Sequence, residues 1–204
     1  MDYRQDADVI YPFYRHDYAD RMKLAPVLTQ KSGNVCMFCS ENENRRKHIE
    51  YLEELSHYIQ IDSIAKQFYS MSKDRAAKKK ALSDFKFVIS FENVSGKDFV
   101  TERFFEPLLA GTVPVYFGAP NIQEFSPGDN CFVDVRQFEN PRTLAGYLNE
   151  CLSDDRLYSR FFDWKSEPLS SCFQRKVDEQ KVNPFIRLCW EIDKRRWRFT
   201  HPNT

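Results

Sequence analysis

The sequence lacks any long hydrophobic run, and no apolar stretch approaches the roughly 18 residues that a membrane-spanning helix needs. The first residues, Met1 to Asp6, are charged and contain no apolar stretch, so we expect neither a signal peptide nor a signal anchor in them. Yet 42% of the 204 residues are hydrophobic and 15% are aromatic, which is far from the composition of a disordered chain. The sequence therefore predicts globular material with a substantial core and no membrane contact from this segment.

The chain also lacks a net charge. Its 30 lysines and arginines balance its 30 aspartates and glutamates, which argues against a general nucleic-acid-binding surface. A local basic cluster at Arg75, Lys78, Lys79 and Lys80 lies in a polar segment. Charge runs of this kind are usually the solvated face of a helix, and we assign the cluster no function.

Cysteines are too few and too scattered for a small disulfide scaffold, with six in the whole chain, and the redox compartment stays open. Cys36 and Cys39 form a C-x-x-C pattern, but they lie in an apolar run that is typical of a strand, and no second pair follows at zinc spacing. We expect buried structural thiols. No His/Asp cluster suits a metal, and Asp154 and Asp155 are more simply a helix N-cap.

What is present is an alternation of strands and helices, which predicts an α/β fold with a Rossmann-like parallel sheet and flanking helices. Strands are predicted at 34–39, 59–62, 85–91, 112–117 and 131–135, and helices over the apolar positions between 49 and 59, at 99–110 and at 141–152. Gly111 is placed to end the second helix, and Pro107 should kink or split it. Residues 185–190 and the rest of the C-terminal part are predicted to form helices that pack back on the sheet. The aromatic residues before about 33 lack a period and suggest a connecting segment.

The loop from Glu92 to Asp98 follows a predicted buried strand, at the edge where parallel sheets bind ligands. It offers Asn93 and Ser95, and the next helix opens with Thr101, Glu102 and Arg103. A cation in the first helical turn works against the helix dipole, so an anionic ligand such as a diphosphate would explain Arg103, while Glu102 could accept hydrogen bonds from a ribose diol. A second interpretation stays open: Glu102 satisfies the helix start and Arg103 forms a surface ion pair.

The run from Phe91 to Arg103, FENVSGKDFVTER, closely resembles the signature F-E-N-x-x-x-x-D-Y-V-T-E-K of family 10 α-1,3/4-fucosyltransferases. The resemblance continues through 109–115 and 118–122 and covers nearly the whole chain, but only the second half of a family member. Trp164-Lys165 and 187–189 are most similar to plant-type enzymes that fucosylate the N-glycan core. Residues 3–8 resemble the close of the family's acceptor domain. We therefore expect residues 1–33 to be a remnant of that domain with a linker, and 34–204 to be the GDP-fucose-binding domain.

The resemblance implies the second domain of a GT-B glycosyltransferase. Carried over residue by residue, Asn93 would contact the phosphates, Phe99 the base or ribose, Glu102 the ribose hydroxyls and Arg103 the diphosphate. A second phosphate-binding arginine is expected at Arg45 or Arg46, although an ungapped alignment places His48 there and a solvated helix start is the alternative. Phe99 stands where the family usually has Tyr, and Arg103 where it usually has Lys, two side chains that are not interchangeable.

The implied reaction is inverting transfer of fucose from GDP-fucose to a GlcNAc-containing glycan, with no metal and no other cofactor. The plant-type resemblance suggests the N-glycan core as this acceptor. The family's general base is a Glu of the acceptor domain, upstream of the residues that the resemblance covers, so we name no catalytic residue. We expect a fragment, a truncated gene model or a degenerate paralogue that binds the nucleotide. A eukaryotic protein would act in the Golgi lumen through an N-terminal anchor, and a bacterial one in the cytoplasm. A non-catalytic GDP-sugar-binding module and a GT-B transferase for another nucleotide sugar are the competing interpretations.

Overall fold

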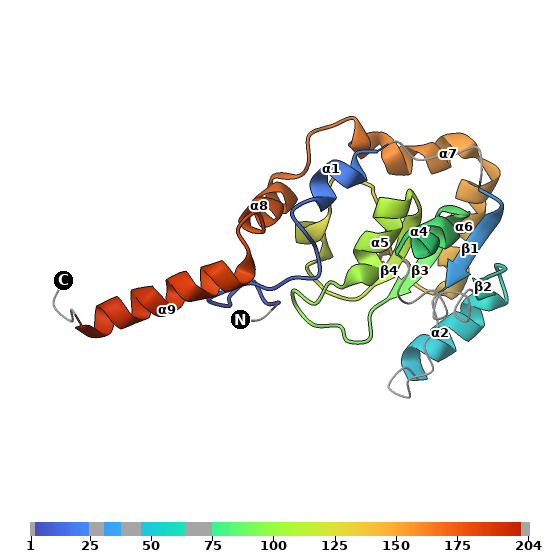
Figure 1. The fold of residues 1–204 in the computed structure, drawn as a ribbon. Helices are drawn as coiled ribbons and strands as arrows, with labels where there is room; N and C mark the ends of the chain where they lie inside the picture. Colours follow the sequence, from blue (N-terminus) through green and yellow to red (C-terminus); the bar gives the residue numbers. More distant parts are fainter. Residues whose placement is uncertain (1–2, 25–30, 38–45, 64–74, 201–204) are drawn as a thin grey trace.

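The computed structural model describes residues 3–24, 31–37, 46–63 and 75–200 (Figure 1). Five parallel strands form one sheet in the order β2-β1-β3-β4-β5. Their bounds are β1 Gly33–Met37, β2 Asp62–Ser63, β3 Phe85–Phe91, β4 Val113–Phe117 and β5 Val133–Asp134. The predicted α/β fold with a Rossmann-like parallel sheet is confirmed, and β3 has the predicted ends.

Helices cover both faces of this sheet (Figure 1). The α-helices are α1 Tyr18–Met22, α2 Arg46–Ser56, α4 Arg75–Ser83, α5 Glu102–Ala110, α6 Pro141–Ser153, α7 Asp155–Ser159, α8 Ser171–Glu179 and α9 Pro184–Thr200. Among the described residues, short 3-10 helices are η3 Ile122–Phe125, η4 Val135–Gln137 and η5 Arg160–Lys165. The chain is therefore a three-layer α/β/α arrangement, as parallel strands with helical crossovers require.

Side chains that alternate along β3 point to opposite faces of the sheet, and the buried residues on these faces form separate clusters. Phe87 and Ile89 point to one core, which α2, α6 and α7 complete. The other face carries a larger core in which Phe104 and Phe105 of α5 meet Phe173 of α8. Because both faces are covered, β3 reads as a nearly continuous apolar run rather than an alternating one.

The segment before residue 33 is more than a connection. Tyr14, Tyr18, Ala19 and Met22 are buried in the α5 core, and residues 18–22 form α1. The prediction that the segment before residue 33 is a connection without secondary structure was therefore wrong. Aromatic side chains without a period can still bury their area when neighbouring elements surround them, and periodicity cannot detect that. The domain boundary at residue 33 stays a prediction.

The C-terminal helix α9 differs from its prediction. It extends away from the sheet (Figure 1), and Phe185, Trp190 and Ile192 are each more than half exposed. Its contacts run instead to the N-terminal segment, where Arg187 donates to the carbonyl oxygen of Ile10 at 2.8 Å. The prediction that residues 185–190 pack back on the sheet was wrong, because helical periodicity does not say which surface a helix meets.

Helix α5 begins later than predicted and runs unbroken to Ala110. Its N-cap is Thr101, with an extended backbone, while Phe99 and Val100 belong to the preceding turn. The split expected at Pro107 is not found. Pro107 is buried, and the backbone N–H that it lacks would have donated to the carbonyl oxygen of Arg103 in the first turn. Gly111 ends the helix at a φ of 73°, as predicted.

Smaller predictions can be compared in the same way. Lys79 and Lys80 are exposed on α4, which confirms a solvated face for these two residues. Cys36 is a fully buried free thiol, as predicted, whereas Cys39 lies outside the described residues. Asp154 is the N-cap of α7 and accepts the amide of Arg156 at 2.8 Å. Within the described ranges, no helix is both long and apolar enough to span a bilayer.

Candidate donor-binding site

The strand order places a topological switch point between β1 and β3. The chain leaves β1 toward β2 on one side and leaves β3 toward β4 on the other. In open α/β sheets a crevice forms beyond the carboxyl ends of two such strands, and ligands bind there. The loop after β3, residues 92–101, lies at this edge. The segment after β1, residues 38–45, lies outside the described residues.

A buried carboxylate fixes the end of this loop to the start of α5. Glu92 follows β3 directly and is 1% exposed. One of its oxygens accepts the backbone N–H of Thr101 at 2.7 Å, and the other accepts the Thr101 hydroxyl at 2.8 Å. The same hydroxyl oxygen accepts the backbone N–H of Arg103 at 3.3 Å. Glu92 thus holds the N-cap residue of the helix that carries the predicted donor-binding side chains.

The first turn of α5 presents the two side chains that the sequence singled out. Glu102 is exposed, and Arg103 is partly buried. The Arg103 guanidinium donates to the carbonyl oxygen of Phe91 at 3.3 Å. Because Phe91 ends β3, this bond places the positive charge at the carboxyl end of that strand. The structure therefore brings Glu102 and Arg103 together at the switch-point edge, beside the positive end of the helix dipole.

Burial raises the pKa of the Glu92 carboxyl to about 7, because desolvation disfavours the charged form more than the bonds from Thr101 and the nearby Arg103 favour it. Gly118 packs closely against this carboxyl. A Cβ atom at Gly118 would meet Glu92 Cγ and the hydroxyl of Tyr116. That hydroxyl oxygen in turn accepts the N–H of Ala119 at 3.1 Å. The residues that directly follow β3 and β4 are thus closely packed against each other.

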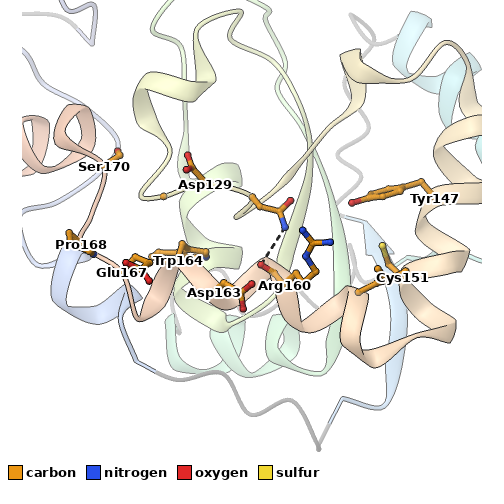
Figure 2. Close-up of a pocket in the computed structure, with 12 residues that line it drawn as sticks. Asp129, Tyr147, Cys151, Arg160, Asp163, Trp164, Glu167, Pro168 and Ser170 are labelled. Carbon is orange, nitrogen blue, oxygen red and sulfur yellow. Dashed lines mark hydrogen bonds between the residues drawn. The ribbon is translucent and has the colours of Figure 1, made fainter.

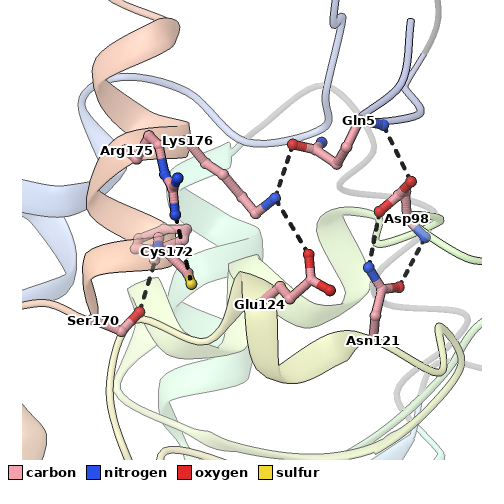
Figure 3. Close-up of polar contacts among 9 residues, drawn as sticks. Gln5, Asp98, Asn121, Glu124, Ser170, Cys172, Arg175 and Lys176 are labelled. Atoms are coloured by element: carbon pink, nitrogen blue, oxygen red, sulfur yellow. Dashed lines mark hydrogen bonds and ion pairs between the residues drawn. The ribbon is translucent and has the colours of Figure 1, made fainter.

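The other anchor of the loop is Asp98, which has a left-handed backbone with φ 65° and is buried. Its backbone N–H donates to Asn121 Oδ1 at 3.0 Å, and its carboxylate accepts Asn121 Nδ2 at 2.9 Å (Figure 3). Its second oxygen accepts the backbone N–H of Gln5 at 3.1 Å. Aspartate tolerates φ > 0 better than most residues, and these bonds fix it there.

The remaining predicted site residues fall into two groups. Asn93 is exposed on the loop, and Phe99 is partly buried, with its ring against the rings of Tyr3 and Phe13. Arg45 lies outside the described residues, and Arg46 begins α2 but its side chain is not described. The ligand contacts expected of all these residues stay predictions.

His48, the alternative to the second arginine, does reach the edge of the site. Its ring lies 5.4 Å from that of Phe91 and 5.3 Å from that of Phe117, both at near-perpendicular angles. Phe91 and Phe117 end β3 and β4, so α2 is brought to the same carboxyl edge as α5. An imidazole at this place could face an anionic ligand.

Sequence reasoning missed Glu92 and Asp98 as members of the site. Both partners of Glu92 belong to Thr101, and those of Asp98 come from positions as distant as Gln5 and Asn121. A signal existed for Glu92, since a carboxylate that directly follows a continuously apolar strand needs hydrogen-bond partners. No local pattern points to the bonds of Asp98.

A cavity of about 480 Å³ lies elsewhere, between α6, η5 and the loop that leads into β5 (Figure 2). Asp129, Asp163 and Arg160 are among its lining residues. That loop enters the amino end of β5, so the cavity is on the opposite edge of the sheet from residues 92–101. In the part of the chain that the structure describes, no three metal-ligating side chains gather in a way that could hold an ion, and metal independence stays a prediction.

Comparison with known proteins identifies the family to which the chain is similar. The family description "Glycosyltransferase family 10 (fucosyltransferase) C-term" matches residues 28–202. GDP-fucose protein O-fucosyltransferase 3 of Homo sapiens is 32% identical over 180 residues, which are 80% of this chain and 36% of that protein. A putative fucosyltransferase-like protein of Arabidopsis thaliana is 38% identical over 112 residues, 55% of this chain and 22% of that protein.

Solved structures share the fold. A crystal structure of an alpha1,3-fucosyltransferase with GDP-fucose has a TM-score of 0.57 at 17% identity and covers 82% of this chain, while 53% of that chain is matched. The chain thus spans about a third of the length of the human relative and about half of the solved one. It belongs to glycosyltransferase family 10, the fucosyltransferases, and corresponds to the family's C-terminal part.

Proposed function

We propose that the chain binds GDP-fucose at the carboxyl edge of its sheet and is the donor-binding part of a fucosyltransferase. The observation that carries the proposal is the first turn of α5, where Glu102 and Arg103 lie together on a helix start that Glu92 holds through Thr101. The family membership and the relatives named for GDP-fucose support this choice of nucleotide sugar.

In this proposal Arg103 binds the diphosphate, and Glu102 accepts hydrogen bonds from the ribose hydroxyls. An acceptor oxygen attacks the anomeric carbon as the bond to the β-phosphate oxygen breaks, and GDP leaves with the configuration inverted. Negative charge grows on the diphosphate during this step, so the Arg103 cation stabilises the transition state more than the ground state. The base that takes the acceptor proton is expected outside the region that the resemblance covers.

For the acceptor, two classes have support. The relatives named as protein O-fucosyltransferases favour a hydroxyl group of a polypeptide. The resemblance of Trp164-Lys165 and 187–189 to plant-type enzymes predicts instead a GlcNAc of an N-glycan core in α-1,3 linkage. We propose the polypeptide hydroxyl, because that support extends over 80% of the chain.

A transfer assay tests the function and separates the acceptors. The chain, together with the acceptor-binding part of its own protein, is incubated with radiolabelled GDP-fucose and either a folded protein without N-glycans or a GlcNAc-terminated N-glycan, and the label in each acceptor is measured. We expect label in the protein in preference to the glycan. Preferred glycan labelling would contradict the proposed acceptor. Binding of the donor without any transfer or hydrolysis would instead favour a non-catalytic GDP-sugar-binding module.

A further inference from the structure

The N-terminal segment lies directly against the loop proposed to bind the nucleotide. The ring of Tyr3 is 5.2 Å from that of Phe99, and the ring of Phe13 is 5.9 Å from it, both edge to face. Two aromatic side chains from residues 3–13 therefore set the orientation of the side chain predicted to flank the base or ribose. Edge-to-face pairs at these distances are attractive beyond their buried area.

Gln5 connects the same segment to the loop and to α8 (Figure 3). Its backbone N–H donates to Asp98, and its side-chain oxygen accepts Lys176 Nζ at 2.8 Å. Lys176 is 8% exposed, lies 3.8 Å from Glu124 Oε2, and has its ammonium 4.5 Å from the centre of the Phe125 ring. A buried cation needs such partners, so Gln5 is held from both sides.

Asp98 is the residue at which these contacts meet the loop. It accepts from Gln5 and from Asn121, and it keeps a left-handed backbone between exposed Lys97 and the turn that precedes Thr101. By contrast, Asn93 and its neighbours up to 95 are exposed. The bonds of Asp98 therefore join this part of the loop to Gln5 and Asn121, which are distant in the sequence.

We propose that residues 3–13 form a clasp that positions loop 92–101 for the nucleotide, with Asp98 as its central positioning residue. This inference rests on the proposed function. A loop that is already ordered before the ligand arrives pays less entropy on binding, so the clasp increases donor affinity without touching the donor. It also makes the N-terminal segment part of the donor site.

The test is calorimetric titration of the 204-residue chain with GDP, comparing the original sequence with Asp98→Gly and Asp98→Asn. Glycine keeps the left-handed backbone but removes both accepted hydrogen bonds, and we expect affinity to fall about tenfold. Asparagine also tolerates this backbone and retains one acceptor oxygen, so a smaller loss is expected. Asp154→Ala removes a helix cap at the other edge of the sheet and serves as a control with unchanged affinity.

Hydrogen exchange supplies a second readout. In Asp98→Gly the amides of residues 98–103 should exchange faster, while those of β3 remain protected. Tyr3→Ala, which leaves Asp98 intact, should produce the same local effect and weaker GDP binding, and it tests the clasp even if Asp98→Gly does not fold.

The outcomes separate this inference from the proposed function. If the original chain fails to bind GDP, both the clasp and the proposed function are wrong. If it binds GDP and the Asp98 and Tyr3 variants bind as tightly, the clasp is wrong and the proposed function stands. If Asp154→Ala weakens binding as much as Asp98→Gly, the effect is general destabilisation and the clasp is also wrong.

Discussion

At the scale of single residues, Arg103 is the side chain on which GDP binding most depends. Its position in the first turn of α5 is unfavourable for a cation unless an anion is bound. Arg103→Ala removes a charge-assisted contact to phosphate and should weaken GDP binding by roughly 1.5–3 kcal/mol, measured by calorimetry. Arg103→Lys, which keeps the positive charge, should lose less of the affinity for GDP. Arg156 is exposed on α7, so Arg156→Ala should bind GDP as tightly as the original chain. Unchanged affinity in Arg103→Ala would refute the role.

Glu92 predicts a pH dependence of stability. The pKa of its carboxyl is about 7 in the folded chain, against 4.5 for an ordinary glutamate. Between these values the folded state holds a proton that the unfolded state releases, so the contribution of Glu92 is complete below pH 4.5 and is lost as the pH rises through 7. The free energy of unfolding should fall by up to about 3 kcal/mol across this window.

The measurement is urea unfolding of the original chain and Glu92→Gln at pH 5 and pH 8. The amide does not titrate, so the variant should gain stability relative to the original chain as the pH rises. Parallel profiles for the two proteins would mean that Glu92 is not responsible.

The residues of the site were predictable only where the signal is local. Glu102 and Arg103 were located because they closely follow a predicted buried strand, and because a cation in the first turn of a helix calls for an anionic partner. Glu92 and Asp98 were not, because their importance comes from bonds to Thr101, Asn121 and Gln5, which the fold brings near. Long-range hydrogen bonds leave no periodic pattern.

At the scale of elements, β3 was predicted with its correct ends because its buried run of β-formers is bounded by polar residues. Strand β5 was predicted too long, at 131–135, since the apolar run continues past its ladder pairs with β4. The predicted end of β1 at residue 39 lies outside the described residues. The direction of α9 was missed for a different reason. Its apolar side chains fit a helix, but an amphipathic pattern does not identify the surface that the helix contacts.

Two glycines allow a matched test of element packing. Gly118→Ala places a methyl group against Glu92 and Tyr116 just after β4 and should lower the free energy of unfolding by about 1–3 kcal/mol. Gly146→Ala, inside α6 with open space around it, should instead raise it by about 0.5–1 kcal/mol. Urea unfolding measures both. Equal effects of the two substitutions would contradict the close packing at Gly118.

At the scale of the whole molecule, alternating strands and helices were enough to predict a parallel sheet covered on both faces, because this topology leaves few other solutions. The placement of residues 3–24 was not predictable, since their buried side chains follow no clear period in the sequence. The second core includes Tyr14 and Met22 from that segment, so both ends of the chain shape the final arrangement.

The core and α9 should therefore respond differently to truncation. Phe173→Ala removes a fully buried ring and should cost about 3–5 kcal/mol of unfolding free energy. Trp190→Ala, at a position that is 54% exposed on α9, should change it by less than about 0.5 kcal/mol. Thermal or urea unfolding measures both. A large loss in the Trp190 variant would show that α9 packs on the body after all.

The central claim is that the carboxyl edge of the sheet binds a guanosine diphosphate sugar. Calorimetric titration of the chain with GDP-fucose, GDP-mannose and UDP-GlcNAc tests it most directly. The account predicts that GDP-fucose binds most tightly and that Arg103→Ala reduces this affinity. Tighter binding of UDP-GlcNAc than of either GDP sugar would contradict it.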